Sequence, residues 1–143
     1  MENGSFAFRG IPYARKPLGE LRWKHAEPHN ELDHCWNGTY LAHEFSKPCW
    51  QFYRNGSYDG SEDCLYLNIF TPKVHYDTPL PVVVFIGGES LNGGESLSLQ
   101  PSAALAYDKN VVFVSLSIRR SVLGFLTLDL LSKKYVLFLC LIS

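Results

Sequence analysis

The chain has 143 residues, of which 46% are apolar and 19% charged, and its formal net charge is −1. An apolar share of this size is normal for a globular protein and excludes a disordered chain. A charge so close to zero gives no attraction to nucleic acid or to an anionic membrane, so we expect neither as a partner.

The predicted elements of the first half are short. Residues 1–60 are rich in Pro, Gly, Asn, His and aromatic residues, which predicts loops and short strands instead of periodic helices. Residues 65–70 form a compact apolar run that ends at a Thr-Pro pair, and this pattern predicts a strand. The β-branched run at 82–86 lacks polar alternation, so we expect a strand covered on both faces.

The second half has the pattern of a βαβ unit. A Gly-rich loop over residues 87–94 follows the first buried strand, and residues 102–108 predict a short helix with Pro101 before it. Residues 111–116 predict a second buried strand, parallel to the first and joined to it by a right-handed crossover. Residues 122–131 are apolar and fit either a strand end or a helix start.

Neither chain end gives a targeting signal. Residues 1–5 are polar and no apolar segment follows them, so no signal peptide is visible in this chain. Residues 135–142 are strongly apolar, but a transmembrane helix needs roughly 20 such residues. We therefore expect no membrane span in these residues.

Three sequons nevertheless suggest a chain that enters the secretory pathway. They begin at Asn3, Asn37 and Asn55, and each lies in a polar stretch with glycine, where an exposed turn is expected. Each asparagine is therefore a candidate for N-glycosylation.

The cysteines and histidines do not form a recognisable metal motif. The four cysteines at positions 35, 49, 64 and 140 allow three pairings, and their spacing alone does not choose among them. No Cys-x-x-Cys pair is present, which argues against a zinc ribbon. Pro28 breaks the helix that would place His25 and His29 on one face, so these are interpreted as loop histidines. We expect no metal and no cofactor.

Two longer motifs carry the main signal. Residues 8–14 read Phe-Arg-Gly-Ile-Pro-Tyr-Ala, and residues 61–68 read Ser-Glu-Asp-Cys-Leu-Tyr-Leu-Asn. In this order and spacing they resemble the N-terminal signature of the type-B carboxylesterase/cholinesterase family of α/β-hydrolases. The resemblance implies the α/β class and the N-terminal part of an α/β-hydrolase fold, with an incomplete, mixed and mostly parallel sheet.

The resemblance implies a partial domain over residues 6–131. Family members carry a short β-hairpin before the first motif and continue into a nucleophile elbow, so the chain resembles a domain truncated at both ends. The resemblance fades near Leu128, which leaves residues 132–143 as an apolar tail of doubtful origin. This tail is interpreted as foreign sequence from a mis-spliced gene, with a buried strand or helix as the alternative.

The resemblance also implies two structural pairs. Family members close a small loop with a disulfide, and the matching residues here are Cys49 and Cys64; such a loop would contribute about 3 kcal/mol. The arginine of the first motif, Arg9, is expected to form a salt bridge with the glutamate of the second, Glu62. A planar guanidinium suits bidentate binding of a carboxylate.

The catalytic chemistry of the family is not visible in this chain. The family uses a serine in a Gly-x-Ser-x-Gly elbow, then an acid, then a histidine. The chain has no such elbow, and its last histidine is His75. Gly88-Glu89-Ser90 and Gly94-Glu95-Ser96 copy the front half of an elbow, but the closing glycine and a later histidine are lacking in both cases. We therefore expect no catalytic residue here.

The loop that would form the oxyanion hole is degenerate. The family has His-Gly-Gly-Gly-Phe there, and the matching positions are Gly87, Gly88, Glu89, Ser90 and Leu91. The family glycines allow the backbone to approach a substrate closely, and two of them are replaced here by Glu89 and Ser90. A carboxylate at Glu89 would also repel the negative charge that the hole should stabilise. Residues 118–121 read Ile-Arg-Arg-Ser, where active members have a Tyr-Arg-Leu-Gly-like turn.

These features lead to two main hypotheses. The first is a fragment of a non-catalytic, neurotactin-like adhesion or recognition domain, which implies a secreted or cell-surface parent and an extracellular protein ligand. The second is a truncated piece of a carboxylesterase whose complete form hydrolyses carboxylic esters. A pseudogene or an erroneous gene model without a stable product is a third interpretation.

Overall fold

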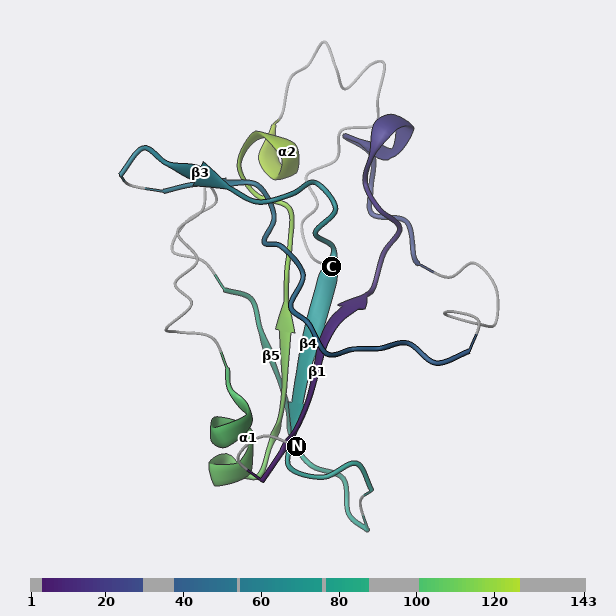
Figure 1. The fold of residues 1–143 in the computed structure, drawn as a ribbon, viewed down its shortest axis with the longest axis vertical. Helices are drawn as coiled ribbons and strands as arrows, with labels where there is room; N and C mark the ends of the chain where they lie inside the picture. Colours follow the sequence, from purple (N-terminus) through teal and green to yellow (C-terminus); the bar gives the residue numbers. More distant parts are fainter. Residues whose placement is uncertain (1–3, 30–37, 54, 76, 88–100, 127–143) are drawn as a thin grey trace.

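The computed structural model describes residues 4–29, 38–53, 55–75, 77–87 and 101–126. Within them, four strands form one sheet in the order β1-β4-β6-β5. Figure 1 shows this sheet upright, with the helices α1 and α2 at opposite ends of the strands. The strands are β1 (Phe6–Pro12), β4 (Tyr66–Thr71), β5 (Val82–Phe85) and β6 (Val112–Leu116).

The sheet is mixed, as expected, but its described part is mostly antiparallel and not mostly parallel as predicted, because the parallel strand pairs of the family fold follow later in the chain than β4. β4 pairs antiparallel with both β1 and β6, and parallel pairing among the described strands is confined to β5 and β6. The connection between β5 and β6 contains the helix α1 (Ala103–Lys109), so the predicted βαβ order is confirmed. The short helix begins one residue later than predicted, because Ser102 is its N-cap: the Ser102 side chain accepts a hydrogen bond from the Leu105 amide at 3.2 Å. It ends at Asn110 in the left-handed conformation.

A bulge lies between β1 and β4. The register shifts between Phe8 and Ile11, and Gly10 at this point has φ +65°. The Gly10 amide donates instead to Oδ1 of the buried Asn68, at 2.9 Å. A Cβ on Gly10 would lie 2.6 Å from the carbonyl oxygen of Glu44, so glycine is required both by conformation and by space.

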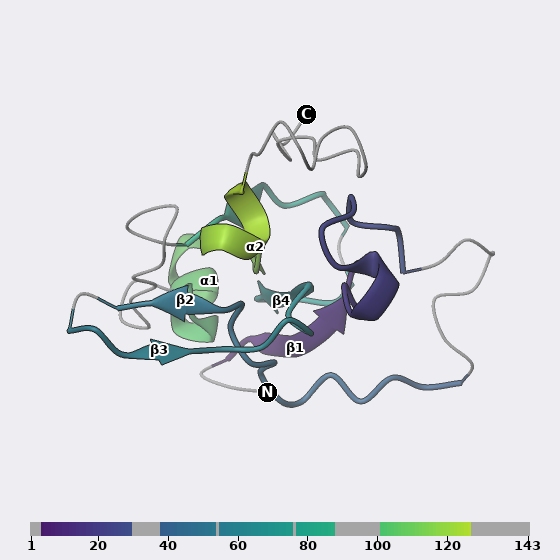
Figure 2. The same ribbon diagram turned by 90° about the horizontal axis from the view of Figure 1, so that it is seen from above.

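The other elements lie around one end of this sheet. They are the 3₁₀ helix η1 (Gly19–Leu21), the short hairpin of β2 (Gln51–Phe52) and β3 (Tyr58–Asp59), and the helix α2 (Ser121–Phe125). Seen from above, the hairpin projects from the body beside α2 (Figure 2). Two small buried clusters hold the fold. One is Ala14, Cys49, Cys64 and Leu65, and the other is Phe70, Ala103 and Ala106, where α1 packs on β4.

The strand β5 is not covered on both faces as its sequence predicted. Val82, Val83 and Val84 are 61%, 42% and 58% exposed. The reason is position, because β5 pairs with β6 alone among the described strands and so lies at the edge of the described sheet. The interior strand is β6, between β4 and β5. An exposed apolar edge strand is a template for pairing with other chains.

Replacing Val84 with lysine should therefore raise the soluble yield of the expressed chain several-fold. A charge on an edge strand blocks edge-to-edge association. The soluble fraction after expression, compared at equal total protein, is the measurement. Val74→Lys is the matched control, because Val74 is also exposed, at 45%, but lies outside every strand. An equal gain in the control would show that charge alone, and not the β5 edge, limits solubility.

Candidate functional site

The candidate site lies where β5 and β6 end. Because these two strands are parallel, Gly87 after β5 and the residues after β6 reach the same end of the sheet. Of the predicted oxyanion-loop positions, Gly87 is described, whereas Gly88, Glu89 and Ser90 lie outside the described residues. The degenerate loop therefore stays a prediction from sequence beyond its first residue.

The first residue of this loop is fixed by a buried arginine. Nη2 of Arg120 donates a hydrogen bond to the carbonyl oxygen of Gly87, and Arg120 is only 4% exposed. No carboxylate among the described residues forms an ion pair with Arg120. A guanidinium that reaches a backbone carbonyl in this way ties the loop start to the beginning of α2. Sequence reasoning noted the unusual 118–121 segment but did not foresee this contact.

The beginning of α2 is strained. Ser121 has φ +55°, in the left-handed region that favours glycine, and it stands where the resembled family has a glycine. The neighbouring turn is tight, because a Cβ on Gly124 would lie 2.4 Å from the Arg119 carbonyl oxygen. Arg119 itself reaches across to the Lys24 carbonyl oxygen at 2.8 Å. The turn is thus anchored on both sides and holds Ser121 in its unfavourable conformation.

Ser121→Gly should stabilise the folded protein by about 1 kcal/mol, since glycine removes the cost of a left-handed non-glycine residue. The midpoint of urea unfolding is the measurement. Ser121→Ala is the control, because it removes the hydroxyl and keeps the Cβ. A gain from alanine equal to that from glycine would show that the backbone conformation is not the cause.

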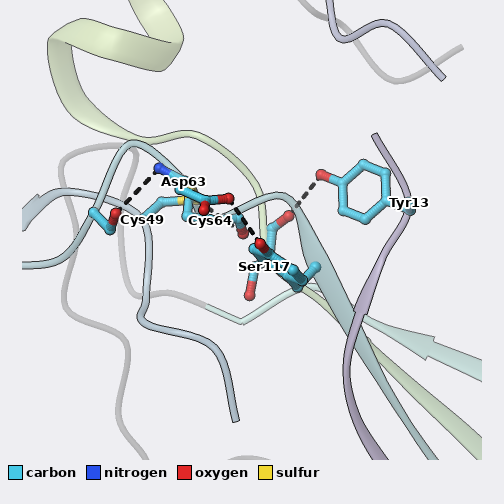
Figure 3. Close-up of a disulfide and its surroundings, with 7 residues drawn as sticks. Tyr13, Cys49, Asp63, Cys64 and Ser117 are labelled. Atoms are coloured by element: carbon cyan, nitrogen blue, oxygen red, sulfur yellow. Dashed lines mark hydrogen bonds between the residues drawn. A yellow bond between two sulfur atoms is a disulfide. The ribbon is translucent and has the colours of Figure 1, made fainter. Parts of the chain in front are cut away.

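The disulfide expected from the family resemblance is present. Cys49 and Cys64 are bonded with their Cα atoms 4.9 Å apart, and both residues are buried. Figure 3 shows the bond beside the end of β6, where the Tyr13 hydroxyl donates to the Ser117 carbonyl oxygen at 2.7 Å. The disulfide therefore lies at the same end of the sheet as Gly87.

The expected salt bridge between Arg9 and Glu62 is wrong. Both oxygens of Glu62 are bound by Arg22, at 2.6 and 2.7 Å. The strand register explains the difference: Phe8 and Ile11 of β1 face Ile69 and Leu67, which places Arg9 beside the middle of β4.

Glu62 does not lie beside the middle of β4, where Arg9 lies. It precedes Tyr66, the first residue of β4, by four residues. The guanidinium of Arg9 instead packs over the Phe45 ring, 4.8 Å from its centroid.

A second carboxylate, Asp63, links three parts of the site. It accepts from Lys16 at 2.7 Å and from the Tyr66 hydroxyl at 2.8 Å, and its own amide donates to Ser61. The hydrogen bond and negative charge of Asp63 raise the pKa of Lys16. Burial, and then the hydrogen bond to Asp63, raises the pKa of Tyr66. Both side chains therefore keep their protons at neutral pH, which suits structural roles.

A groove of mixed polar and apolar lining lies next to this region, between the hairpin and the sheet. Its described lining residues are Phe45, Ser46, Pro48, Gln51, Tyr53, Asp59, Asn68, Pro101, Ser102, Ser115 and Ser117. The described lining contains no histidine and no cysteine. It offers hydroxyl and amide groups, which can bind a polar ligand.

Two further features are absent from the described residues. No group of three or more His, Cys, Asp or Glu side chains there could hold a metal ion. Among the same residues, no helix has the length and apolar character needed to cross a membrane.

Comparison with known proteins decides the family. The sequence pattern of the Carboxylesterase family matches residues 2–133. The chain belongs to the carboxylesterase family. It is 50% identical to neurotactin of Drosophila melanogaster over 133 residues, covering 93% of this chain and 16% of that protein. It is 41% identical to acetylcholinesterase of Danio rerio over 137 residues, covering 86% of this chain and 21% of that protein.

A solved structure of the family supports the same fold. The carboxylesterase EST55 of Geobacillus stearothermophilus is 35% identical, with a TM-score of 0.74, and the match covers 88% of this chain and 25% of that one. The described residues are therefore part of an α/β-hydrolase fold. The chain spans about a quarter or less of each of these relatives, so the activity and partners of a whole protein do not follow from membership.

Of the three sequon asparagines, the structure describes one. Asn55 is exposed in the turn between β2 and β3, whereas Asn3 and Asn37 lie outside the described residues. Sequence reasoning therefore found the disulfide and one exposed sequon. It chose the wrong arginine for Glu62 and did not foresee the hydrogen bond from Arg120 to Gly87.

Proposed function

We propose that this chain is part of an esterase-like domain, residues 6–131, that serves recognition at the cell surface and not ester hydrolysis. The observation that carries the proposal is the 50% identity with neurotactin over 93% of the chain. The identities with acetylcholinesterase of Danio rerio and juvenile hormone esterase of Tribolium castaneum are 41% and 42%. By sequence, this chain is thus nearer to a neurotactin-like member than to these two esterases.

Two local features support the recognition role. The sequence has Glu89 and Ser90 where a working oxyanion hole has glycines. Side chains at these positions disfavour the backbone conformation in which the amides of the loop point at the substrate oxygen. Arg120 donates to the Gly87 carbonyl oxygen at the start of that loop. Replacement of the oxyanion-hole glycines is expected in a domain whose fold is kept for a binding surface. The ligand would be an extracellular protein, and no cofactor or metal is part of the proposal.

The test is binding to cells. The complete extracellular region of the parent protein, expressed as a soluble dimer, should bind intact cells of the same animal, and protease treatment of those cells should remove the binding. The same dimer, unfolded by heat before the assay, is the control and should not bind. Absence of protease-sensitive binding across the animal's tissues, by a folded dimer, would contradict the proposal.

A second candidate is favoured by the esterases among the relatives: the chain is a piece of an active carboxylesterase. Its prediction is distinct, because the coding sequence downstream would contain an in-frame Gly-x-Ser-x-Gly, then an acid and a histidine. Such a protein would hydrolyse short-chain aryl esters, and mutation of the elbow serine would abolish turnover. In the present chain, Ser90→Ala should change nothing measurable above buffer background.

A further inference from the structure

The β2–β3 hairpin ends in a turn that is held by local hydrogen bonds. The Tyr53 amide donates to the Ser57 carbonyl oxygen at 2.9 Å, and the Gly56 amide donates to the Tyr53 carbonyl oxygen at 3.0 Å. Gly56 has φ +82°, in the left-handed region. A turn followed by a left-handed glycine is a common way to close a hairpin with a bulge. These contacts join Tyr53, Gly56 and Ser57, which all belong to the turn itself.

Asn55 is held inside this turn in one orientation. Its Oδ1 accepts two hydrogen bonds from Ser57, from the amide at 3.0 Å and from the hydroxyl at 2.7 Å. Its Nδ2 donates to none of the described residues, and Asn55, Gly56 and Ser57 are all exposed. The carbonyl side of the amide is therefore engaged, while the nitrogen faces solvent. Because both hydrogen bonds are accepted by Oδ1, the Nδ2 side of the amide is the side that faces outward.

We propose that Asn55 is an N-glycosylated residue, and that the turn geometry, beyond the three sequon letters, makes it an efficient acceptor. The Ser57 hydroxyl that the sequon requires is the same group that donates to Oδ1 of Asn55. The residues of the sequon therefore also make the hydrogen bonds that orient the Asn55 side chain in the turn. Delivery of the chain to the glycosylating compartment rests on the extracellular function proposed above. The acceptor geometry itself does not, because it is built from contacts among Tyr53, Asn55, Gly56 and Ser57.

The chemistry of the step is a substitution at a sugar. The Nδ2 atom of Asn55 forms a bond to C1 of the first sugar of a lipid-linked oligosaccharide diphosphate. The bond between C1 and the diphosphate oxygen breaks, and the lipid diphosphate leaves with that electron pair. Nδ2 gives up one proton to the medium. No oxidation or reduction takes place, and the co-reactant is the oligosaccharide donor of the secretory pathway.

The surface next to the turn fits a glycan at this position. Phe52 and Tyr58 are 58% and 67% exposed, and their ring centroids are 6.4 Å apart. They form the last pair of the hairpin before the turn. Exposed aromatic side chains on a secreted protein promote association. A glycan rooted at Asn55, at the hairpin tip, would lie close enough to shield this pair from other copies of the chain.

The experiment forces delivery, so that acceptor quality alone is measured. The full 143-residue chain, behind a cleavable signal peptide and carrying Asn3→Gln and Asn37→Gln, is translated with microsomes. A mobility shift of one glycan, reversed by peptide N-glycosidase, should appear in most chains. Ser57→Ala should abolish the shift, and Ser57→Thr should keep it.

Gly56→Ala is the decisive variant because it keeps a valid sequon and disturbs only the turn. A Cβ on Gly56 would meet nothing within 4 Å, so its effect comes from the left-handed φ alone. We expect the modified fraction to fall several-fold. Full modification of Gly56→Ala would overturn the role of the turn, and an unmodified parent chain would overturn the site itself.

A separate readout distinguishes this proposal from the proposed function. The same glycosidase treatment is applied to the natural full-length protein from its own cells. If that protein carries no glycan although the chain is modified in microsomes, the cell-surface location is wrong and the acceptor geometry stands. If the natural protein carries other glycans but none at Asn55, the site is wrong and the location stands.

Discussion

Gly60→Ala should destabilise the folded protein by about 4 kcal/mol, combining a backbone strain of about 1–3 kcal/mol with a steric cost of similar size. Gly60 follows β3 with φ +128°, and a Cβ there would lie 2.7 Å from both the Cys49 carbonyl carbon and the Trp50 amide nitrogen. These are backbone atoms beside the disulfide, so no flexible side chain can move aside. The midpoint of urea unfolding of the parent protein is the measurement.

Gly19→Ala is the matched control for this effect. Gly19 also has a positive φ, +56°, but a Cβ there would meet nothing within 4 Å. The control should therefore cost only about 1 kcal/mol, from the left-handed conformation alone. Equal losses at the two positions would show that close packing between residues 49–50 and Gly60 is not what excludes a side chain.

Removal of the disulfide by the double change Cys49→Ala and Cys64→Ala should cost about 3 kcal/mol, as the chain-entropy estimate gives for a loop of this length. The bond joins residues 15 apart and lies in one of the two described buried clusters. Thermal unfolding under non-reducing conditions measures the loss, and peptide mapping checks the pairing. An unchanged transition in the alanine pair would contradict a structural role for the bond.

Several parts of the fold could be predicted because their signals are local. The run of β-branched residues at 82–86 and the apolar run at 111–116 became β5 and β6, and Ser102 caps the helix between them. The disulfide followed from the family motif and not from spacing, which left three pairings open. These elements need no knowledge of distant contacts beyond the motif.

The errors concern long-range contacts. The two motifs suggested Arg9 for Glu62, but the β1–β4 register separates them and brings Arg22 there instead. The exposure of β5 also depends on sheet order, which places β6 between β4 and β5. No pattern inside residues 82–86 reports on its neighbours across the sheet. The same holds for Arg120, whose contact with Gly87 joins residues 33 apart in sequence.

We propose that the domain keeps the carboxylesterase fold for recognition without its nucleophilic chemistry. The most direct measurement is covalent labelling of the purified full-length parent protein with a fluorophosphonate, which reacts with an activated serine. An active acetylcholinesterase, treated in parallel, is the positive control. We expect no label on the parent protein at probe concentrations that saturate the control. Labelling of one serine per chain, lost when that serine is replaced by alanine, would contradict the claim and identify the protein as an esterase.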